Sequence, residues 1–195
     1  MRTATLRRQT RETSITLTLT LEGSGQTTLA TGVGFLDHML DAFSRFALID
    51  LSVQCTGDLH VDAHHTVEDT GICLGQALRQ ALGDRTGIRR AGSAFMPMDE
   101  ALAFAAVDIS GRPYLAFDAA FAAPMCGDMD TQLAEEFFRA VATQAGLTLH
   151  LRVLSGRNDH HKMEALFKAF GLALRDAAAV DPRIMGTLST KGMLD

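Results

Sequence analysis

Two short segments of this chain combine a histidine pair with a glutamate at a spacing suited to metal binding. Residues 64–68 read His-His-Thr-Val-Glu, and residues 160–164, which begin 96 positions later, read His-His-Lys-Met-Glu. On a helix, residues three and four apart share one face, while adjacent side chains point about 100° apart. Each glutamate can therefore join one imidazole at a metal while the other imidazole serves a second ion. The six candidate ligands are His64, His65, Glu68, His160, His161 and Glu164.

The likeness between the two segments extends beyond the metal-type residues. The downstream residues that recur at the same offset are Gly75, Ala77, Leu78 and Arg79, which match Gly171, Ala173, Leu174 and Arg175. A single His–Glu pair at helical spacing is usually a surface contact, but surface solvation gives no reason for such repetition. We interpret the pattern as an internal duplication that carries two copies of a metal motif. Imidazole with carboxylate suits manganese, iron, cobalt or zinc, and no cysteine lies near either motif.

Further ligands are expected on the helices that precede the two motifs. His38 lies 26 residues before His64, and Glu136 lies 24 residues before His160, so the two occupy comparable places. The alternatives are a core histidine for His38, which sits beside an apolar stripe, and a solvated side chain for Glu136. We expect His60 and His150 to be structural.

Alternating and helical hydrophobic patterns predict the elements that must position these residues. In the first half we expect strands at 12–23 and 27–30, joined as a hairpin, then a helix at 35–46, a strand at 48–54 and a helix from 64 to about 82. In the second half we expect strands at 101–109 and 114–121, an irregular link at 125–131, a helix at 133–145, a strand at 147–154 and a helix to about 179.

Each half thus reads strand, strand, helix, strand, helix, which favours an α+β fold. Hairpins join antiparallel strands directly, so a strictly alternating parallel sheet fits the order less well. We expect two repeats, residues 1–91 and 92–195, in which two sheets enclose the helices packed between them. The two repeats together are expected to form one body.

Composition narrows the classes of function. Hydrophobic residues make up 47% and charged residues 21% of the 195 residues, as in ordinary globular proteins. The formal net charge of −5 argues against nucleic-acid binding. No apolar run approaches the length of a membrane span, and no signal peptide is expected at the charged N-terminus. Cys55, Cys73 and Cys126 are not closely paired, which predicts free thiols in a reducing cytoplasm.

Longer motifs make the chain recognisable. It resembles the imidazoleglycerol-phosphate dehydratase family in residues 35–40, 57–71, 107–113, 156–161 and 189–192, within a likeness that runs from about Arg11 to Gly192. The resemblance implies dehydration of imidazole glycerol phosphate to imidazole acetol phosphate in L-histidine biosynthesis. It also implies two Mn²⁺ per active site and a homo-oligomer of 24 subunits with sites at subunit interfaces.

The resemblance also assigns roles to residues that spacing alone leaves as ordinary surface groups. The implied metal ligands are His38, His64, His65, Glu68, Glu136, His160, His161 and Glu164. The implied catalytic residues are Glu12 and four of these ligands, His64, Glu68, His160 and Glu164. The implied substrate-binding residues are Glu12, His38, Arg90, Arg112, Lys168, Ser189, Thr190 and Lys191. Many members carry His in place of Glu136 and Asp in place of Ala63, although glutamate can still bind a hard cation.

The implied chemistry explains why two ions are needed. The proton to be removed lies on a carbon with no adjacent carbonyl, so an ordinary enolate cannot form. If both ring nitrogens of the substrate are bound to metal, an imidazolate-type intermediate can expel the hydroxyl, with the metals acting as Lewis acids and template. Glu12 is the candidate for moving a proton. The residues that bind the substrate phosphate would supply binding energy remote from the reacting carbons.

Two other functions are compatible with the metal motifs alone. A dinuclear metallohydrolase would use a metal-bound water and release phosphate or amine instead of a ketone. In a metal-assembled shell protein without enzymatic activity, the ions would only join subunits. Substrate analogues would then bind the metal-loaded form no better than the metal-free form.

Overall fold

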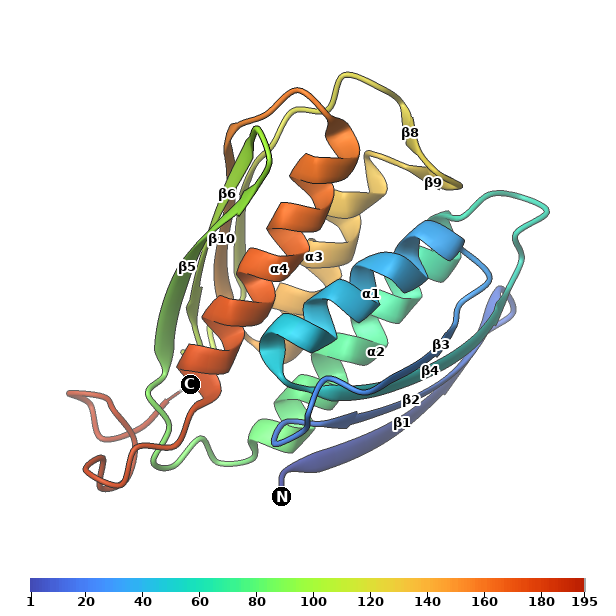
Figure 1. Ribbon diagram of the computed structural model, residues 1–195. Coiled ribbons are helices and arrows are strands. Elements are labelled where there is room, and N and C mark those ends of the chain that lie inside the picture. The colour runs from blue at the N-terminus through green and yellow to red at the C-terminus, as the bar shows by residue number, and fades with distance from the viewer. Residues whose placement is uncertain (195) are drawn as a thin grey trace.

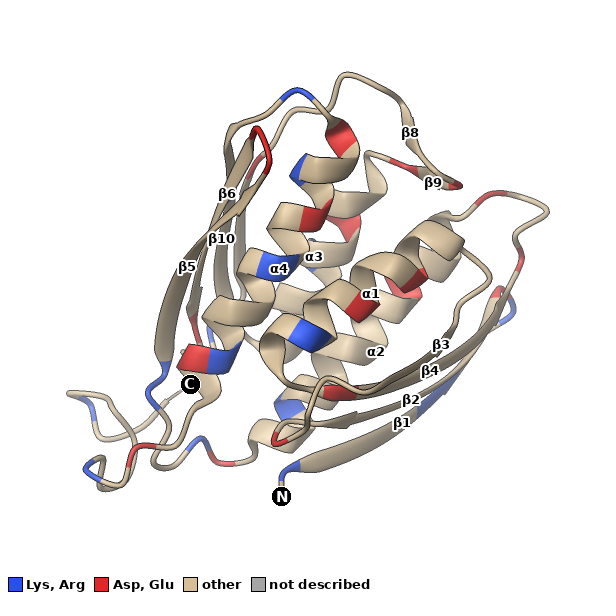
Figure 2. Ribbon diagram, viewed as in Figure 1, with Lys and Arg blue, Asp and Glu red and all other residues tan. Residues whose placement is uncertain are grey.

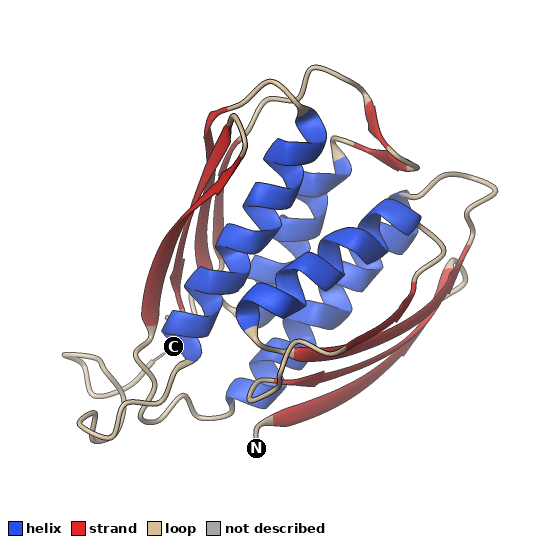
Figure 3. Cartoon of the chain, in the orientation of Figure 1, coloured by secondary structure: helices blue, strands red, loops and turns tan. Residues whose placement is uncertain are grey.

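The computed structural model describes residues 1–194, in which two four-stranded sheets enclose four helices (Figure 1 and Figure 3). The first half contains β1 (Thr3–Gln9), β2 (Thr13–Thr20), β3 (Thr27–Ala30), α1 (Gly34–Ala47), β4 (Asp50–Gly57) and α2 (His64–Leu82). The second half contains β5 (Ala91–Met98), β6 (Ala101–Asp108), β7 (Tyr114–Asp118), β8 (Met125–Cys126), β9 (Met129–Asp130), α3 (Leu133–Ala145), β10 (Thr148–Ser155) and α4 (Asp159–Ala178). The α+β class and the helices between two sheets are as predicted.

The two sheets have the same topology, which supports the interpretation of a duplication. The strand order is β1-β2-β4-β3 in the first sheet and β5-β6-β10-β7 in the second. In each sheet the first three strands in this order are antiparallel, whereas β3 lies parallel to β4 and β7 lies parallel to β10. The predicted division between residues 91 and 92 falls at the start of β5.

The predicted hairpin partner of β2 was wrong. We expected β3 to return alongside β2, and β7 alongside β6, but both short strands instead run parallel to the strand that follows the next helix. Parallel neighbours need a crossover connection, and α1 and α3 supply it. Period-two alternation therefore identified the strands without identifying their partners.

The actual hairpins use two strands that the pattern did not predict, so each half begins with one more strand than expected. β1 pairs with β2 and β5 pairs with β6. β5 carries Gly92 and Pro97, which weaken a strand pattern but are tolerated in an edge strand. Gly92 is needed for close packing, because a Cβ there would lie 2.2 Å from the carbonyl oxygen of Ala173 on α4. The link at 125–131, expected to be irregular, contains the small β8–β9 pair.

One hydrophobic core runs through both halves, with α1 packed on α4 and α2 packed on α3. Two glycines at the duplicated offset allow these helices to approach closely. A Cβ on Gly75 would lie 2.7 Å from the carbonyl oxygen of Val141, and a Cβ on Gly171 would lie 2.7 Å from that of Phe43. Stacked rings of Phe43 and Phe170, 5.1 Å apart, fill the space beside the second crossing. No helix within residues 1–194 is both long enough and apolar enough to span a membrane.

The three cysteines are free, as expected. Cys73 and Cys126 are buried, and Cys55 is only half-buried. Burial raises the pKa of the Cys55 and Cys73 thiols to about 11, so both remain protonated near neutral pH. These thiols are consequently poor nucleophiles and poor metal ligands.

Candidate functional site

Two predicted ligands of the second motif, His160 and Glu164, lie close to a third predicted ligand, His38, from another helix. On α1, His38 Nε2 lies 3.1 Å from Glu164 Oε2, and His160 Nε2 lies 3.2 Å from the same oxygen. The three ligand atoms lie within 4.8 Å of one another, and this is the one such convergence of three metal-type side chains found in the described part of the chain. Both imidazoles are about half exposed, whereas Glu164 is buried. Two imidazole nitrogens and one carboxylate oxygen fit a divalent cation.

Lys168 supports this cluster from the next turn of α4. Its Nζ lies 2.5 Å from Glu164 Oε1, the oxygen that faces away from the histidines. Burial opposes ionisation of Glu164, but the hydrogen bond and charge of Lys168 outweigh it and hold the pKa of that carboxyl below its usual value. Glu164 is therefore a carboxylate near neutral pH, the state in which it can bind a cation. Within a single chain, Lys168 therefore contacts Glu164, which is one of the predicted metal ligands.

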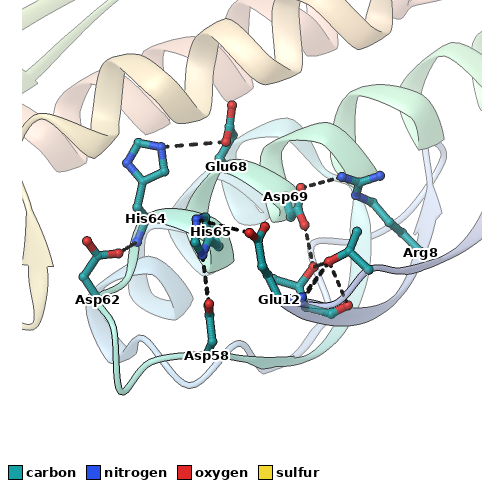
Figure 4. A network of polar contacts seen from close by, with 10 residues as sticks. Arg8, Glu12, Asp58, Asp62, His64, His65, Glu68 and Asp69 are labelled. Atoms are coloured by element: carbon teal, nitrogen blue, oxygen red, sulfur yellow. Dashed lines mark hydrogen bonds and ion pairs between the residues drawn. The ribbon is translucent and has the colours of Figure 1, made fainter.

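The first histidine pair is less complete within one chain. His64 Nε2 lies 3.7 Å from Glu68 Oε2, one turn along α2 (Figure 4). Glu136, on the neighbouring helix α3, lines the same cavity of about 540 Å³ as His64. Its carboxylate is 3.8 Å from Arg139 Nη2. The predicted role of Glu136 as a ligand stays a prediction.

Helix packing exchanges the outer residues between the two halves. His38 belongs to the first half but meets the second histidine pair, because α1 packs on α4 (Figure 1). Glu136 belongs to the second half but lies with the first pair, because α3 packs on α2. The order of the sequence put each residue before the motif of its own half, and the crossing of the helices reverses that pairing.

The other histidine of each pair is held by a carboxylate that sequence reasoning did not identify. His65 Nδ1 lies 3.0 Å from Asp58 Oδ2, and His161 Nδ1 lies 2.9 Å from Glu100 Oε2. These hydrogen bonds raise the pKa of both imidazoles. Backbone N–H donors and His161 lower the pKa of Glu100 to about 2. Such carboxylates commonly orient metal-binding histidines, leaving Nε2 available.

A polar residue precedes each helix at the duplicated offset, although Asn158 is the N-cap of α4 whereas the N-cap of α2 is Ala63. Asp62 Oδ1 accepts a hydrogen bond of 2.8 Å from the backbone N–H of His64. Asn158 Oδ1 accepts one of 3.2 Å from the backbone N–H of His161. Asp and Asn satisfy the unpaired N–H groups of a first helical turn. The sequence signal for these two residues was present in the repeat itself, since Asp62 and Asn158 are also 96 positions apart.

The residues expected to bind the substrate phosphate gather elsewhere, except Lys168, which contacts Glu164. A cavity of about 530 Å³ is lined by Arg90, Arg112, Ser189, Thr190 and Lys191. Asp108 accepts a 2.7 Å hydrogen bond from Arg90 Nε and so holds the guanidinium in place. Figure 2 shows basic residues around the C-terminal end of α4 and on the tail beyond it. Hydroxyls and fixed guanidinium groups of this kind suit a phosphate.

This basic cavity and the histidine cluster lie at opposite ends of α4. The backbone N–H of Arg90 bonds to the carbonyl of Ala177 in the last turn, whereas His160 lies in the first. A helix of 20 residues is about 30 Å long. Apart from Lys168, a single chain therefore does not bring the predicted phosphate-binding and metal-binding residues together, and their roles stay predictions.

Comparison with known proteins shows the family to which the chain belongs. The family model described as imidazoleglycerol-phosphate dehydratase matches residues 31–174. The chain is 64% identical over 187 residues to the imidazoleglycerol-phosphate dehydratase of Symbiobacterium thermophilum, covering 96% of this chain and 90% of that protein. It is 58% identical over 194 residues to the enzyme of the same name from Listeria welshimeri, covering 100% of both chains.

Solved structures give the same result. The crystal structure of imidazoleglycerol-phosphate dehydratase from Staphylococcus aureus matches with a TM-score of 0.84 at 40% identity, covering 92% of this chain and 99% of that one. The enzyme from Pyrococcus furiosus, in complex with (S)-C348, also matches with a TM-score of 0.84, at 39% identity, covering 97% of this chain and 100% of that one. The chain therefore belongs to the imidazoleglycerol-phosphate dehydratase family of hydro-lyases.

Proposed function

We propose that the chain catalyses the dehydration of imidazole glycerol phosphate to imidazole acetol phosphate and water in L-histidine biosynthesis. Membership of the dehydratase family supports the reaction. The convergence of His38, His160 and Glu164 is the geometric observation that carries the proposal, because it supplies ligands for a cation beside an open surface.

Two divalent ions per active site, proposed as Mn²⁺, would supply the positive charge that favours an imidazolate-type form of the substrate ring. The donor set of imidazoles and carboxylates fits such ions. The proposed ligands are His38, His64, His65, Glu68, Glu136, His160, His161 and Glu164. Asp58 and Glu100 would keep their histidines in the orientation that leaves Nε2 free.

The remaining proposed roles belong to residues that would act on the substrate directly. Glu12 is exposed, with its Oε1 3.8 Å from His65 Nε2, so it can reach a substrate held beside His65 and move a proton there. Arg90 and Arg112, with Lys191 and the hydroxyls of Ser189 and Thr190, would bind the phosphate and fix the reacting carbons. Lys168, whose Nζ contacts Glu164, would hold that carboxylate ionised and is also proposed to help bind the substrate phosphate.

A complete site would need more than one subunit. The basic cavity lies about 30 Å from the histidine cluster along α4, and within residues 1–194 no third close ligand converges with the first histidine pair. Both observations support a homo-oligomer in which neighbouring chains complete each site. We propose the 24-subunit assembly that the resemblance implies. A cytoplasmic location, expected from the free thiols, is part of the same proposal.

The test is a dehydration assay on protein purified without chelator, after its bound metal has been measured. The metal-loaded protein should convert imidazole glycerol phosphate to the ketone product, and chelation should abolish turnover. Glu12→Gln should lower kcat while leaving the metal content unchanged. Thr18→Val, which removes a hydroxyl paired with Thr5 on the outer face of the first sheet, serves as the control.

The products separate this function from the alternatives. Release of inorganic phosphate without ketone would favour a dinuclear metallohydrolase. Substrate analogues that bind the metal-loaded form no better than the metal-free form would favour a shell protein. Absence of ketone from fully metal-loaded protein would refute the dehydratase proposal. Sizing with and without chelator tests whether ligands from neighbouring subunits couple metal binding to assembly.

A further inference from the structure

A buried carboxylate on α2 ties both strands of the first hairpin to the helix. Asp69 is 6% exposed. Its Oδ1 accepts a 2.8 Å hydrogen bond from Arg8 Nη2 on β1, and its Oδ2 accepts a 2.5 Å hydrogen bond from Thr13 Oγ1 on β2 (Figure 4). A buried carboxylate left without partners would be costly, so both contacts constrain where the hairpin lies on the helix.

The turn between these two strands is itself held by hydrogen bonds. Thr10 Oγ1 accepts 3.0 Å hydrogen bonds from the backbone N–H groups of Glu12 and Thr13. On its other side, the backbone N–H of Asp58 donates to the carbonyl of Glu12 at 3.0 Å. Asp58 is also the carboxylate that holds His65. The backbone of Glu12 is thus bonded on both sides, and its side chain projects toward His65 (Figure 4).

The position of Asp69 on α2 links the β1–β2 hairpin to the part of the helix that carries His65. It lies four residues after His65 and directly after Glu68, so it shares a helical face with the imidazole. Moving the hairpin relative to α2 would change the separation of 3.8 Å between Glu12 Oε1 and His65 Nε2. The duplicated half offers no counterpart, because Ala165 occupies the equivalent position.

We propose that Asp69 is a positioning residue that acts through Thr13 and Arg8 to hold the Glu12 carboxylate beside His65, where it can exchange a proton with a bound substrate. This inference rests on the proposed catalytic role of Glu12. Asp69 itself touches neither substrate nor metal. Its effect is confined to the step that depends on the placement of the Glu12 carboxylate.

The first test is Asp69→Ala in the metal-loaded oligomer. We expect kcat to fall by about ten- to a hundredfold, the order of loss that misplacement of a catalytic group by about 1 Å causes. KM and the bound metal should stay as in the parent protein, since the phosphate-binding residues and the ligands are untouched. A purely structural role would lower the fraction of folded, metal-loaded protein instead.

The second test is a double-variant cycle with Glu12→Gln. If Asp69 acts through Glu12, Asp69→Ala should cause little further loss of kcat once Glu12 is replaced, because the two changes remove the same effect. Equal losses in both backgrounds would overturn the inference, as would an unchanged kcat in Asp69→Ala. If Glu12→Gln alone leaves kcat unchanged, the proposed role of Glu12 fails instead, and the two failures are therefore distinguishable.

A milder pair of variants decides the question if Asp69→Ala does not fold. Thr13→Val removes the hydroxyl that contacts Asp69 but keeps the shape of the side chain, whereas Thr13→Ser retains the hydroxyl. We expect a loss of kcat in Thr13→Val and recovery in Thr13→Ser. Thr5→Val, which removes a hydroxyl from the same hairpin far from the turn, should behave like the parent protein. Equal activity of Thr13→Val and Thr13→Ser would refute the inference.

Discussion

The two histidine segments lie at the start of equivalent helices but are supported differently. Asp62 and Asn158, at equivalent positions, each accept a hydrogen bond from a backbone N–H of the histidine pair. In the first half, buried Asp69 fastens a hairpin that carries Glu12 next to His65. In the second half the hairpin turn between β5 and β6 reaches the motif directly, since it carries Glu100, which bonds His161.

The second segment also has a support that the first lacks. Asp159 and Lys162 form a buried ion pair of 2.8 Å on either side of the histidine pair. Asp159 accepts hydrogen bonds from the backbone N–H groups of Ala122 and Ala123, and Lys162 donates to the carbonyl of Ala120. The equivalent first-half positions are Ala63 and Thr66, which carry no charge.

The difference shows which parts of a duplicated unit are constrained by backbone geometry. The glycines at the helix crossings recur because the same close backbone approach requires them in each half. The polar supports differ because a different segment packs against each motif: the β1–β2 hairpin against α2, and the loop before β8 against α4. Three matched pairs of substitutions test this distinction.

The largest expected effect is the loss of the ion pair in the second half. Lys162→Met leaves the buried carboxylate of Asp159 without its charged partner, and we expect the free energy of unfolding to fall by about 3 kcal/mol. Equilibrium unfolding in denaturant measures this free energy. The matched change in the first half is Thr66→Val, which should cost at most about 1 kcal/mol. Similar losses in both variants would show that the two segments are supported alike.

The next largest loss of stability is expected for the glycines at equivalent positions of the two halves. Gly75→Ala and Gly171→Ala each force a Cβ to within 2.7 Å of a backbone oxygen on the crossing helix. Overpacking of this kind typically costs about 1–3 kcal/mol, and we expect comparable losses in thermal unfolding for both variants. Gln80→Ala, on the exposed side of α2, is the control and should show no loss. A loss in only one variant would break the equivalence of the crossings.

The smallest expected effect concerns the orientation of the histidines. Glu100→Gln should weaken Mn²⁺ binding by about tenfold, because the side chain would no longer hold His161 as a carboxylate does. Asp58→Asn should have a smaller effect, since Glu100 also accepts hydrogen bonds from the N–H groups of Arg157 and Asn158 that lead into α4. Calorimetric titration of the metal-free protein measures both variants, with Glu135→Gln on the surface as control. Unchanged affinity in Glu100→Gln would contradict the expectation.

Much of the fold could be predicted from local patterns. The helix at 133–145 has the predicted bounds, and the helix beginning at His64 ends at Leu82 as expected. The strands β1 and β5 were missed because few of their inward residues are large and apolar. β5 turns Gly92 toward α4 and carries Pro97, so its sequence lacks the usual signal of a strand.

The candidate site was only partly accessible to sequence reasoning. Adjacent histidines with a glutamate three residues later are visible in any reading of the chain. Asp58 and Glu100 were not singled out, because a carboxylate in a turn is common and its contact with a distant histidine has no local signature. The same holds for Asp69, whose partners Arg8 and Thr13 are more than 50 positions away in the chain.

The sequence by itself determined the duplication, the two metal-type motifs and the helices that carry them, because helical periodicity and residue spacing are local properties. Only the tertiary structure decided that His38 meets the second motif and Glu136 the first, since that depends on which helices cross. It also decided that the basic cavity and the histidine cluster lie at opposite ends of α4. Contacts between distant segments depend on the packing of the whole core, and no spacing rule encodes them.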